Sequence, residues 1–284
     1  MKNKKFVVYI LCALVFLNIL AWNVVLNNGS SRLLELVFFD IGQGDAIFIE
    51  TPRKYQILID GGPDSLIIEK LAREMDFGDN AIDLIILTHP DSDHITGLID
   101  VLERYKVDNI IYTGVAKNTI KYKKFKDLIE KQDAKIIIAK HGQRIKLGQV
   151  VLDILYPFEN LYNKEISNVN NTSVVARMSF KENSFLFTGD IVEKGEKEIL
   201  EKQILLDSDV LKTAHHGSKT SSSREFIEAV SPEIAVIQCE RNNRFGHPHL
   251  ETMEIFKEFG VKVFRTDIDG DIRIIADGAK IKYE

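Results

Sequence analysis

The sequence lacks the cysteines that a disulfide framework or a thiolate metal site would need. Its two cysteines are Cys12 and Cys239, and Cys12 lies inside an apolar leader. No CxxC pair occurs, which excludes a zinc ribbon held by thiolates. An excess of positive charge is also missing, since the formal net charge is -5. This balance argues against a protein whose main task is to coat nucleic acid, although a local basic patch stays compatible with it.

Internal repeats, low-complexity tracts and long linkers are likewise missing after Ser31. The composition is that of a globular protein, with 45% hydrophobic and 28% charged residues. A chain of 284 residues is long enough for one domain with a large core. We therefore expect one folded domain after the leader.

The leader itself is an apolar run over residues 6–26, interrupted only by Asn18 and Asn23 and preceded by three lysines. About 20 helical residues span a bilayer core, and lysines at the start keep that end in the cytoplasm. We expect a retained membrane anchor that holds the domain outside the cytoplasmic membrane. A cleaved signal peptide, which would release a secreted protein, is the alternative. A short polar linker follows, up to Ser31.

Strand-like and helix-like segments alternate from Leu33 onward. Helix-like segments are residues 66–75, 95–105, 122–131, 193–201, 224–230 and 251–259. Strand-like segments are residues 33–39, 46–50, 56–59, 84–87, 136–138, 150–155, 173–180, 184–187, 210–212, 234–237, 262–264 and 271–275. The early strands follow one another closely, whereas helices separate the later ones. This order predicts an α/β fold with a mixed sheet, or two sheets, flanked by helices.

The densest chemical motif follows the apolar strand at residues 84–87. It contains His89, Asp91, Asp93 and His94, four side chains able to bind a metal within six residues. Loops after strands are where α/β folds place their sites. A helix cap would explain one of the two aspartates but gives no role to two histidines. Imidazole with carboxylate suits Zn²⁺, Mn²⁺ or Fe²⁺.

Further clusters repeat this chemistry. Asp190 follows a glycine at the end of a strand, His215 and His216 follow the strand at residues 210–212, and His247 and His249 share a later loop. Six of the seven histidines thus lie in three short loops, and only His141 stands apart. Such concentration is typical of a site that folding brings together.

The ordered motifs HPDSDH, FTGD, HHGS and GHPH resemble the metallo-β-lactamase superfamily, and more narrowly its ComEC-like hydrolase domains. FDIGQGDA at residues 39–46 and LIDGG at residues 58–62 agree with that resemblance, which covers residues 33–275. It implies an αββα sandwich over residues 32–284, after an anchor or signal segment with its linker at residues 1–31. A single apolar segment cannot form a channel, so DNA import by this chain alone is not implied.

The same resemblance implies a site with two divalent ions, Zn or Mn, that activate a water. His89 and Asp91 would hold one ion, Asp93, His94 and one of the pair His215 and His216 the other, and Asp190 would bridge them. Asp93 would also steer the proton of the nucleophile, and His247 would contact or protonate the substrate. The surrounding positions would be Asp60, which orients a histidine, and Asn171, which faces the first ion. Lys212, Ser218 and His249 would either support the ligands or contact the substrate. Lys212 and Lys219, which flank the histidine pair, could stabilise an anionic substrate or be solvated surface lysines.

Two departures from the family pattern affect the first ion. Asp91 stands where the superfamily often has histidine, and an asparagine-rich stretch at residues 168–173 replaces the third-motif histidine. A hard oxygen donor in place of nitrogen moves the balance from zinc towards manganese. We therefore expect Mn²⁺ to support turnover at least as well as Zn²⁺.

The resemblance implies a phosphodiester substrate, either extracellular DNA or another polyanion. Seven lysines between Lys117 and Lys135, with Tyr122 and Phe125 among them, could follow a phosphate backbone or could form an ordinary solvated helix face. Two alternatives stay open: a phosphoesterase on a cell-wall or lipid-linked phosphodiester, and a non-catalytic module that captures DNA for a transport machine. Lactone and β-lactam substrates rank lower, because the HHGS loop and the missing histidine favour the phosphodiester branch.

Overall fold

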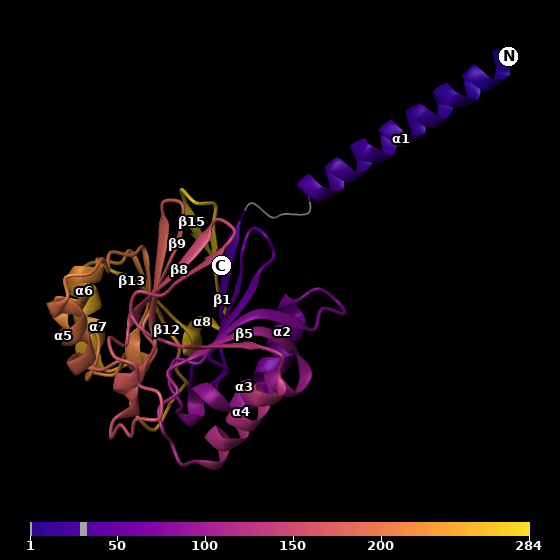
Figure 1. Cartoon of the computed structure of the whole chain (residues 1–284). Helices are drawn as coiled ribbons and strands as arrows, with labels where there is room; N and C mark the ends of the chain where they lie inside the picture. Colours follow the sequence, from indigo (N-terminus) through magenta and orange to yellow (C-terminus); the bar gives the residue numbers. More distant parts are fainter. Residues whose placement is uncertain (1, 29–32) are drawn as a thin grey trace.

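The computed structural model describes residues 2–28 and 33–284. Helix α1 (Lys2–Asn28) contains an 18-residue apolar stretch, Lys5–Trp22, that is long enough to cross a membrane. The described side chains of this stretch are exposed, and α1 extends away from the rest of the chain (Figure 1). A signal sequence and an anchor both fit this helix, because both are apolar and lie near the N-terminus.

The described strands form two mixed sheets, one of eight strands and one of seven. The first has the order β15 (Ile281–Tyr283), β14 (Ile272–Ala276), β1 (Leu34–Phe38), β2 (Ile47–Glu50), β3 (Gln56–Ile59), β4 (Ala81–Ile86), β5 (Lys106–Tyr112) and β6 (Lys135–Ile138). The second has the order β13 (Lys262–Arg265), β12 (Ile234–Ile237), β11 (Val210–Lys212), β10 (Asn183–Phe187), β9 (Val175–Phe180), β8 (Val150–Tyr156) and β7 (Arg144–Leu147).

Helices cover the outer face of each sheet (Figure 1). On the first sheet lie α2 (Leu66–Glu74), α3 (Ser92–Arg104) and α4 (Ile120–Lys131); on the second lie α5 (Glu193–Glu201), α6 (Arg224–Val230) and α7 (Leu250–Glu258). Shorter turns are α8 (Thr266–Asp269), η1 (Val169–Thr172) and η2 (Ala214–Gly217). A third apolar cluster fills the space between the sheets. The expected αββα sandwich is confirmed.

The two sheets present their site loops at the same edge. Strand β4 pairs in parallel with β3 and β5, and β11 pairs in parallel with β10 and β12. Parallel strands buried on both faces read as continuous apolar runs, as residues 84–87 do. Because parallel strands all end at one edge, the loops after β4, β10, β11 and β12 lie near one another, as open α/β sheets require for a site.

The first turn of α3, which contains Asp93 and His94, is clamped against the turn after β3. The Gly61 amide donates to the His94 carbonyl at 2.8 Å, and the Gly97 amide donates to the Gly62 carbonyl at 3.1 Å. A Cβ added to Gly97 would lie 1.9 Å from the Gly61 carbonyl oxygen, so a side chain there has no space. Glycine at this helical position therefore allows the close contact that positions α3.

We expect Gly97→Ala to lower the free energy of unfolding by about 1–3 kcal/mol, because α3 must move off the turn after β3. Urea unfolding would measure the change. Glu130→Ala, at an exposed position of α4, is the matched helical control and should change stability by less than about 0.5 kcal/mol. Equal stability of Gly97→Ala and the wild type would contradict the close packing described above.

Candidate metal centre

Asp190 lies at the centre of the histidine loops. It follows β10, and its side chain is buried. Its Oδ2 atom lies 3.4 Å from Nε2 of both His94 and His216, 3.8 Å from Nε2 of His89 and 4.0 Å from Nε2 of His215. Segments that are far apart in the sequence thus bring four imidazoles to one carboxylate.

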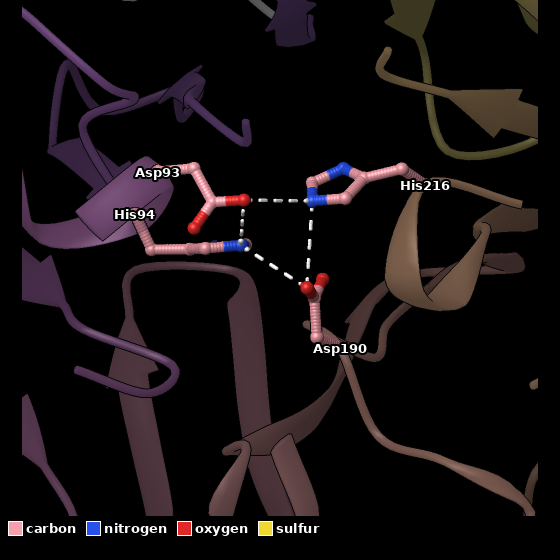
Figure 2. A group of neighbouring side chains, drawn as sticks. All are labelled: Asp93, His94, Asp190 and His216. Carbon is pink, nitrogen blue, oxygen red and sulfur yellow. Dashed lines mark ion pairs between the residues drawn. The ribbon is translucent and has the colours of Figure 1, made fainter. Parts of the chain in front are cut away.

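One side of this centre is a compact four-residue cluster of Asp93, His94, Asp190 and His216 (Figure 2). The potential ligand atoms all lie within 4.8 Å of one another. Asp93 Oδ2 lies 3.4 Å from His216 Nε2. Ligand atoms bound tetrahedrally to one zinc ion at ~2.0–2.1 Å lie about 3.4 Å apart. The spacing therefore fits one divalent cation between these side chains.

Several atoms of the centre are buried and have no hydrogen-bond partner among the described residues. They are Nε2 of His89, His94 and His216 and Oδ1 of Asp190. Buried polar atoms are almost always paired, because an unpaired one costs about 1–3 kcal/mol. The three unpaired imidazole nitrogens lie around Asp190 and fit a bound metal, and this His/Asp cluster is typical of a binuclear site.

The other side of the centre contains His89 and Asp91. Asp91 Oδ2 lies 3.6 Å from His89 Nε2, and Asp91 Oδ1 accepts a hydrogen bond from the Lys117 ammonium. Burial alone would raise the pKa of Asp91, but His89 and Lys117 outweigh it and lower that pKa to about 2. Lys117 thus fixes one carboxylate oxygen and leaves the other directed at the centre.

The outer nitrogens of His94 and His216 have fixed partners. His94 Nδ1 lies 2.8 Å from Asp60 Oδ2, and Asp60 also accepts hydrogen bonds from the Thr88 amide and hydroxyl. His216 Nδ1 lies 2.9 Å from the Gln238 carbonyl and 3.3 Å from Asp45 Oδ1. A partner on Nδ1 sets the ring orientation and leaves Nε2 free for a metal.

Charge balance within the centre depends on these contacts. Burial lowers the pKa of His94 and of His216, but the carboxylate of Asp190, aided by Asp60 or Asp45, outweighs it and holds both pKa values well above the ordinary range. Burial likewise opposes ionisation of Asp190, yet His216 and His94 hold its pKa well below the ordinary range. A dication can take the place of the imidazolium protons in such a cluster.

The paired histidines adopt an unusual backbone. His215 and His216 have φ of 49° and 55°, in the left-handed region that non-glycine residues rarely occupy. The His215 amide donates to the Gly189 carbonyl at 3.1 Å, which ties this turn to the Asp190 loop. Strain of this kind costs on the order of 1–3 kcal/mol for each residue and persists where the surroundings hold it. The turn directs His216 into the four-residue cluster, while His215 lies outside it.

Lys212 lies behind the candidate metal ligands and does not line the pocket. Its side chain is 1% exposed, its Nζ lies 2.7 Å from Asp45 Oδ2, and it donates to the Thr213 carbonyl. This environment agrees with a supporting position behind the ligands and not with contact to a substrate. Lys212 instead neutralises Asp45 behind His216. Lys219, the other flanking lysine, is 56% exposed and lies 3.8 Å from Glu251.

The asparagine at the centre is Asn170 and not Asn171, which corrects the sequence-based assignment. Asn170 Nδ2 lies 3.2 Å from His215 Nε2, and Asn170 lines the metal pocket. Asn171 lies in another cavity, where its carbonyl accepts a hydrogen bond from the Tyr156 hydroxyl. In the 3₁₀ turn η1 consecutive side chains point about 120° apart, so adjacent asparagines face different cavities.

The pocket above the centre has a volume of about 230 Å³. Its lining is Gln43, Asp91, Ser92, Asp93, Asn170, Asp190, His215, His216, Phe245 and His247.

Burial, then His216 and His215, lowers the pKa of His247 to about 4, so this ring is neutral at pH 7. The ring centroids of His247 and His249 lie 5.0 Å apart. His249 Nδ1 accepts a hydrogen bond from the Lys219 amide, and the Ser218 hydroxyl forms a hydrogen bond with the Thr220 hydroxyl. His249 and Ser218 therefore support the loops and are not part of this lining.

The buried pair Lys212–Asp45 gives a direct test of this supporting role. Lys212→Met should lower the free energy of unfolding by about 3–5 kcal/mol, because Asp45 is left buried without its cation. The double variant Lys212→Met/Asp45→Asn should regain much of that loss. Lys106→Met, at an exposed lysine, is the control for the substitution itself. Urea unfolding that shows no loss for Lys212→Met would refute the pairing.

Comparisons with known proteins agree with this geometry. The chain is 29% identical over 256 residues to ComE operon protein 3 of Bacillus subtilis, covering 84% of this chain and 32% of that protein. It is 31% identical over 238 residues to competence protein ComA of Neisseria gonorrhoeae, covering 83% of this chain and 31% of that protein. The chain thus spans about a third of the length of these relatives.

Among solved structures, the metallo-beta-lactamase fold protein YhfI from Bacillus subtilis superposes with a TM-score of 0.53 at 13% identity, covering 81% of this chain and 96% of that protein. This likeness shows the fold. The family pattern of the Metallo-beta-lactamase superfamily matches residues 39–240, which include the loops of His89, Asp190 and His216. The chain therefore belongs to the metallo-β-lactamase superfamily, in which it is homologous to the competence proteins over most of its length.

Proposed function

We propose that this protein is a metal-dependent phosphodiesterase that cleaves DNA or a related polyanion outside the cytoplasmic membrane. The observation that supports it most is the position of Asp190, whose Oδ2 atom lies within 4.0 Å of four imidazole nitrogens. A shared carboxylate between two sets of ligands is what a two-metal hydrolase needs, whereas a module that only binds DNA does not need it.

Two bound divalent ions, Mn²⁺ or Zn²⁺, would supply hydroxide at neutral pH and neutralise charge that develops on the phosphate. His89, Asp91 and Asp190 would hold one ion, and Asp93, His94, Asp190 and His216 the other. Asp93 is the partly exposed carboxylate of the cluster, and His216 and His94 keep its pKa low against the effect of burial. It can therefore accept a hydrogen bond from the attacking water and orient it.

His247 is placed to contact the substrate. The centroid of its ring lies 6.1 Å from the centroid of the His216 ring. Both residues line the pocket above the candidate metal centre. Because the ring is neutral, we assign it a hydrogen-bond contact to a phosphate oxygen. Gln43 Nε2 lies 3.5 Å from His247 Nδ1 and sets the orientation of the ring.

A cationic groove beside the centre supports a polyanionic substrate. Lys117, Lys123 and Lys126 line a cavity of about 470 Å³, and Lys117 also contacts Asp91. The lysine strip does not act as one surface, since Lys121 and Lys124 pair with Thr96 and Glu103 on α3. Both aromatic residues of α4, Tyr122 and Phe125, are buried in the core and cannot stack on bases. The remaining cations can attract a phosphate backbone.

The relatives and the leader support the substrate and the location. Two relatives are named competence protein ComA and, in Haemophilus influenzae, recombination protein 2, and both names refer to processes that act on DNA. The apolar helix α1 would place the domain at the membrane, with Lys2, Lys4 and Lys5 in the cytoplasm. A lipid-linked or cell-wall phosphodiester would suit the same location and is the alternative substrate.

The first expectation concerns the metals. Elemental analysis of the full-length protein after loading and desalting should give two divalent ions per chain, and Asp190→Ala should hold fewer. Chelation should lower the melting temperature, since a ligand at 1,000 times its Kd stabilises the native state by about 4 kcal/mol. Asp108→Ala, an exposed acidic residue near the start of β5, is the control. One ion per chain in the wild type at saturation would contradict the shared carboxylate.

The second expectation concerns cleavage. Metal-stripped full-length protein, reloaded with Mn²⁺ or Zn²⁺, would be assayed on single- and double-stranded DNA and on a chromogenic phosphodiester. Asp190→Ala should lose more than about 100-fold in kcat/KM, because loss of even an outer-shell partner costs 10- to 100-fold. It should still bind DNA, and Asp108→Ala should match the wild type. Mn²⁺ should support turnover at least as well as Zn²⁺.

The outcomes separate the alternatives. Cleavage of the chromogenic phosphodiester without cleavage of DNA would favour a cell-wall or lipid-linked substrate. DNA binding without any cleavage would favour the capture module. Activity with zinc alone would refute the expected effect of Asp91 on metal choice.

A further inference from the structure

An exposed phenylalanine borders the candidate metal centre. Phe245 lies in the loop between β12 and α7, and its side chain is 47% exposed. It lines the metal pocket and also an adjoining cavity of about 380 Å³, together with Gln43 and Arg244. A large apolar ring exposed at the border of two polar cavities indicates a contact surface for a ligand with an apolar face.

The loop holds this ring in a defined place. Asn243 Oδ1 accepts hydrogen bonds from the amides of Phe245 and His247, at 3.1 and 2.9 Å. Its Nδ2 donates to the carbonyls of Glu240 and His247, at 2.9 and 2.6 Å. The Glu240 amide in turn donates to Gln43 Oε1 on the first sheet's turn. A loop fixed by these hydrogen bonds loses little entropy when a ligand packs against it.

A cation without a carboxylate partner lies over the ring. The Arg244 guanidinium lies over Phe245 at 4.8 Å from the ring centroid, and Arg241 is exposed on the same loop. In the described part of the chain, neither arginine makes a hydrogen bond or an ion pair, unlike Arg144 and Arg224, which pair with carboxylates. A free guanidinium group over an aromatic ring suits a ligand that combines a planar base with phosphates.

The ring is also close to the metal ligands. Phe245 and His247 are nearly parallel, with centroids 5.6 Å apart and an interplanar angle of 19°. His247 lies 6.1 Å from His216, a member of the four-residue cluster. A nucleotide whose phosphate occupies the centre can therefore bring its own or the neighbouring base to Phe245.

We propose that Phe245, with Arg244 beside it, is a stacking platform for a nucleobase, and that the protein selects nucleic acid with an unpaired nucleotide at the cleavage site. This rests on the proposed phosphodiesterase function. Bases inside a duplex are already stacked on both faces, so only an unpaired or terminal base can offer a face to the ring. Arg244 shifts from the ring to a phosphate when the base stacks.

The test compares two single strands of equal length and charge. One is an ordinary oligodeoxynucleotide, and the other is a chain of abasic phosphodiesters that has no bases. Full-length protein loaded with Mn²⁺ should prefer the base-bearing strand, and Phe245→Ala should reduce that preference by about tenfold or more, since stacking contributes about 1–3 kcal/mol per base. Phe245→Trp should keep the preference. Phe77→Ala removes another exposed phenylalanine and is the matched control.

A fluorescent base gives a readout that does not depend on turnover. A strand containing unpaired 2-aminopurine should lose fluorescence when it binds Asp190→Ala, and much less when it binds Asp190→Ala/Phe245→Ala. If Phe245→Ala lowered cleavage of both strands equally, or lowered cleavage of neither, the stacking role of Phe245 would be overturned. The proposed phosphodiesterase function would be unaffected by that result. Failure of the wild type to cleave either strand would instead overturn the proposed activity on DNA.

Discussion

The buried carboxylate of Asp190, surrounded by imidazole nitrogens, is the constraint on which the rest of the site depends. Two more carboxylates, Asp91 and Asp93, face the same small space. So many ionisable groups at low exposure are costly unless cations and fixed hydrogen bonds compensate them. The arrangement is understandable as a metal centre, because the unpaired imidazole nitrogens around Asp190 would be its ligands. Every loop that supplies a ligand starts at the end of a strand, so the sandwich sets the spacing.

The layer of contacts behind the ligands also joins the two sheets. Asp45, in the turn between β1 and β2, pairs with Lys212 at the end of β11. Gln238, just after β12, donates to the carbonyls of Phe39 and Ala46 and accepts from His216. These buried polar contacts are satisfied across the sheet interface, and such networks rigidify the surroundings of a site. The candidate metal ligands thus come from both sheets, and their supports connect the same two sheets.

Much of this could be predicted from the sequence because the signals are local. Apolar strands such as residues 56–59 and 234–237 have the predicted bounds, and the concentration of histidines in short loops predicted side chains that the fold brings together. Strand β5 was missed because Asp108 and Asn109 interrupt its apolar pattern, and the edge strands β7 and β15 because they are short and half polar. Burial of such a strand comes from its neighbours, which a window of sequence does not contain.

The errors at the site have the same origin. The environment of Lys212 depends on Asp45, a residue that lies far away in the chain and belongs to no metal motif, so its burial had no sequence signal. The choice between Asn170 and Asn171 depends on the phase of one 3₁₀ turn. Gln43, Asn243 and Gln238 were overlooked because amides lack the chemistry that makes aspartate and histidine conspicuous. Their roles follow only from distances across the fold.

Anomalous diffraction from crystals of the Mn²⁺-loaded protein tests the central claim most directly. We expect two manganese peaks about 3.5–4 Å apart, both bound to Asp190, one beside His89 and the other beside His94 and His216. A single peak away from Asp190, or none at saturating Mn²⁺, would contradict the account.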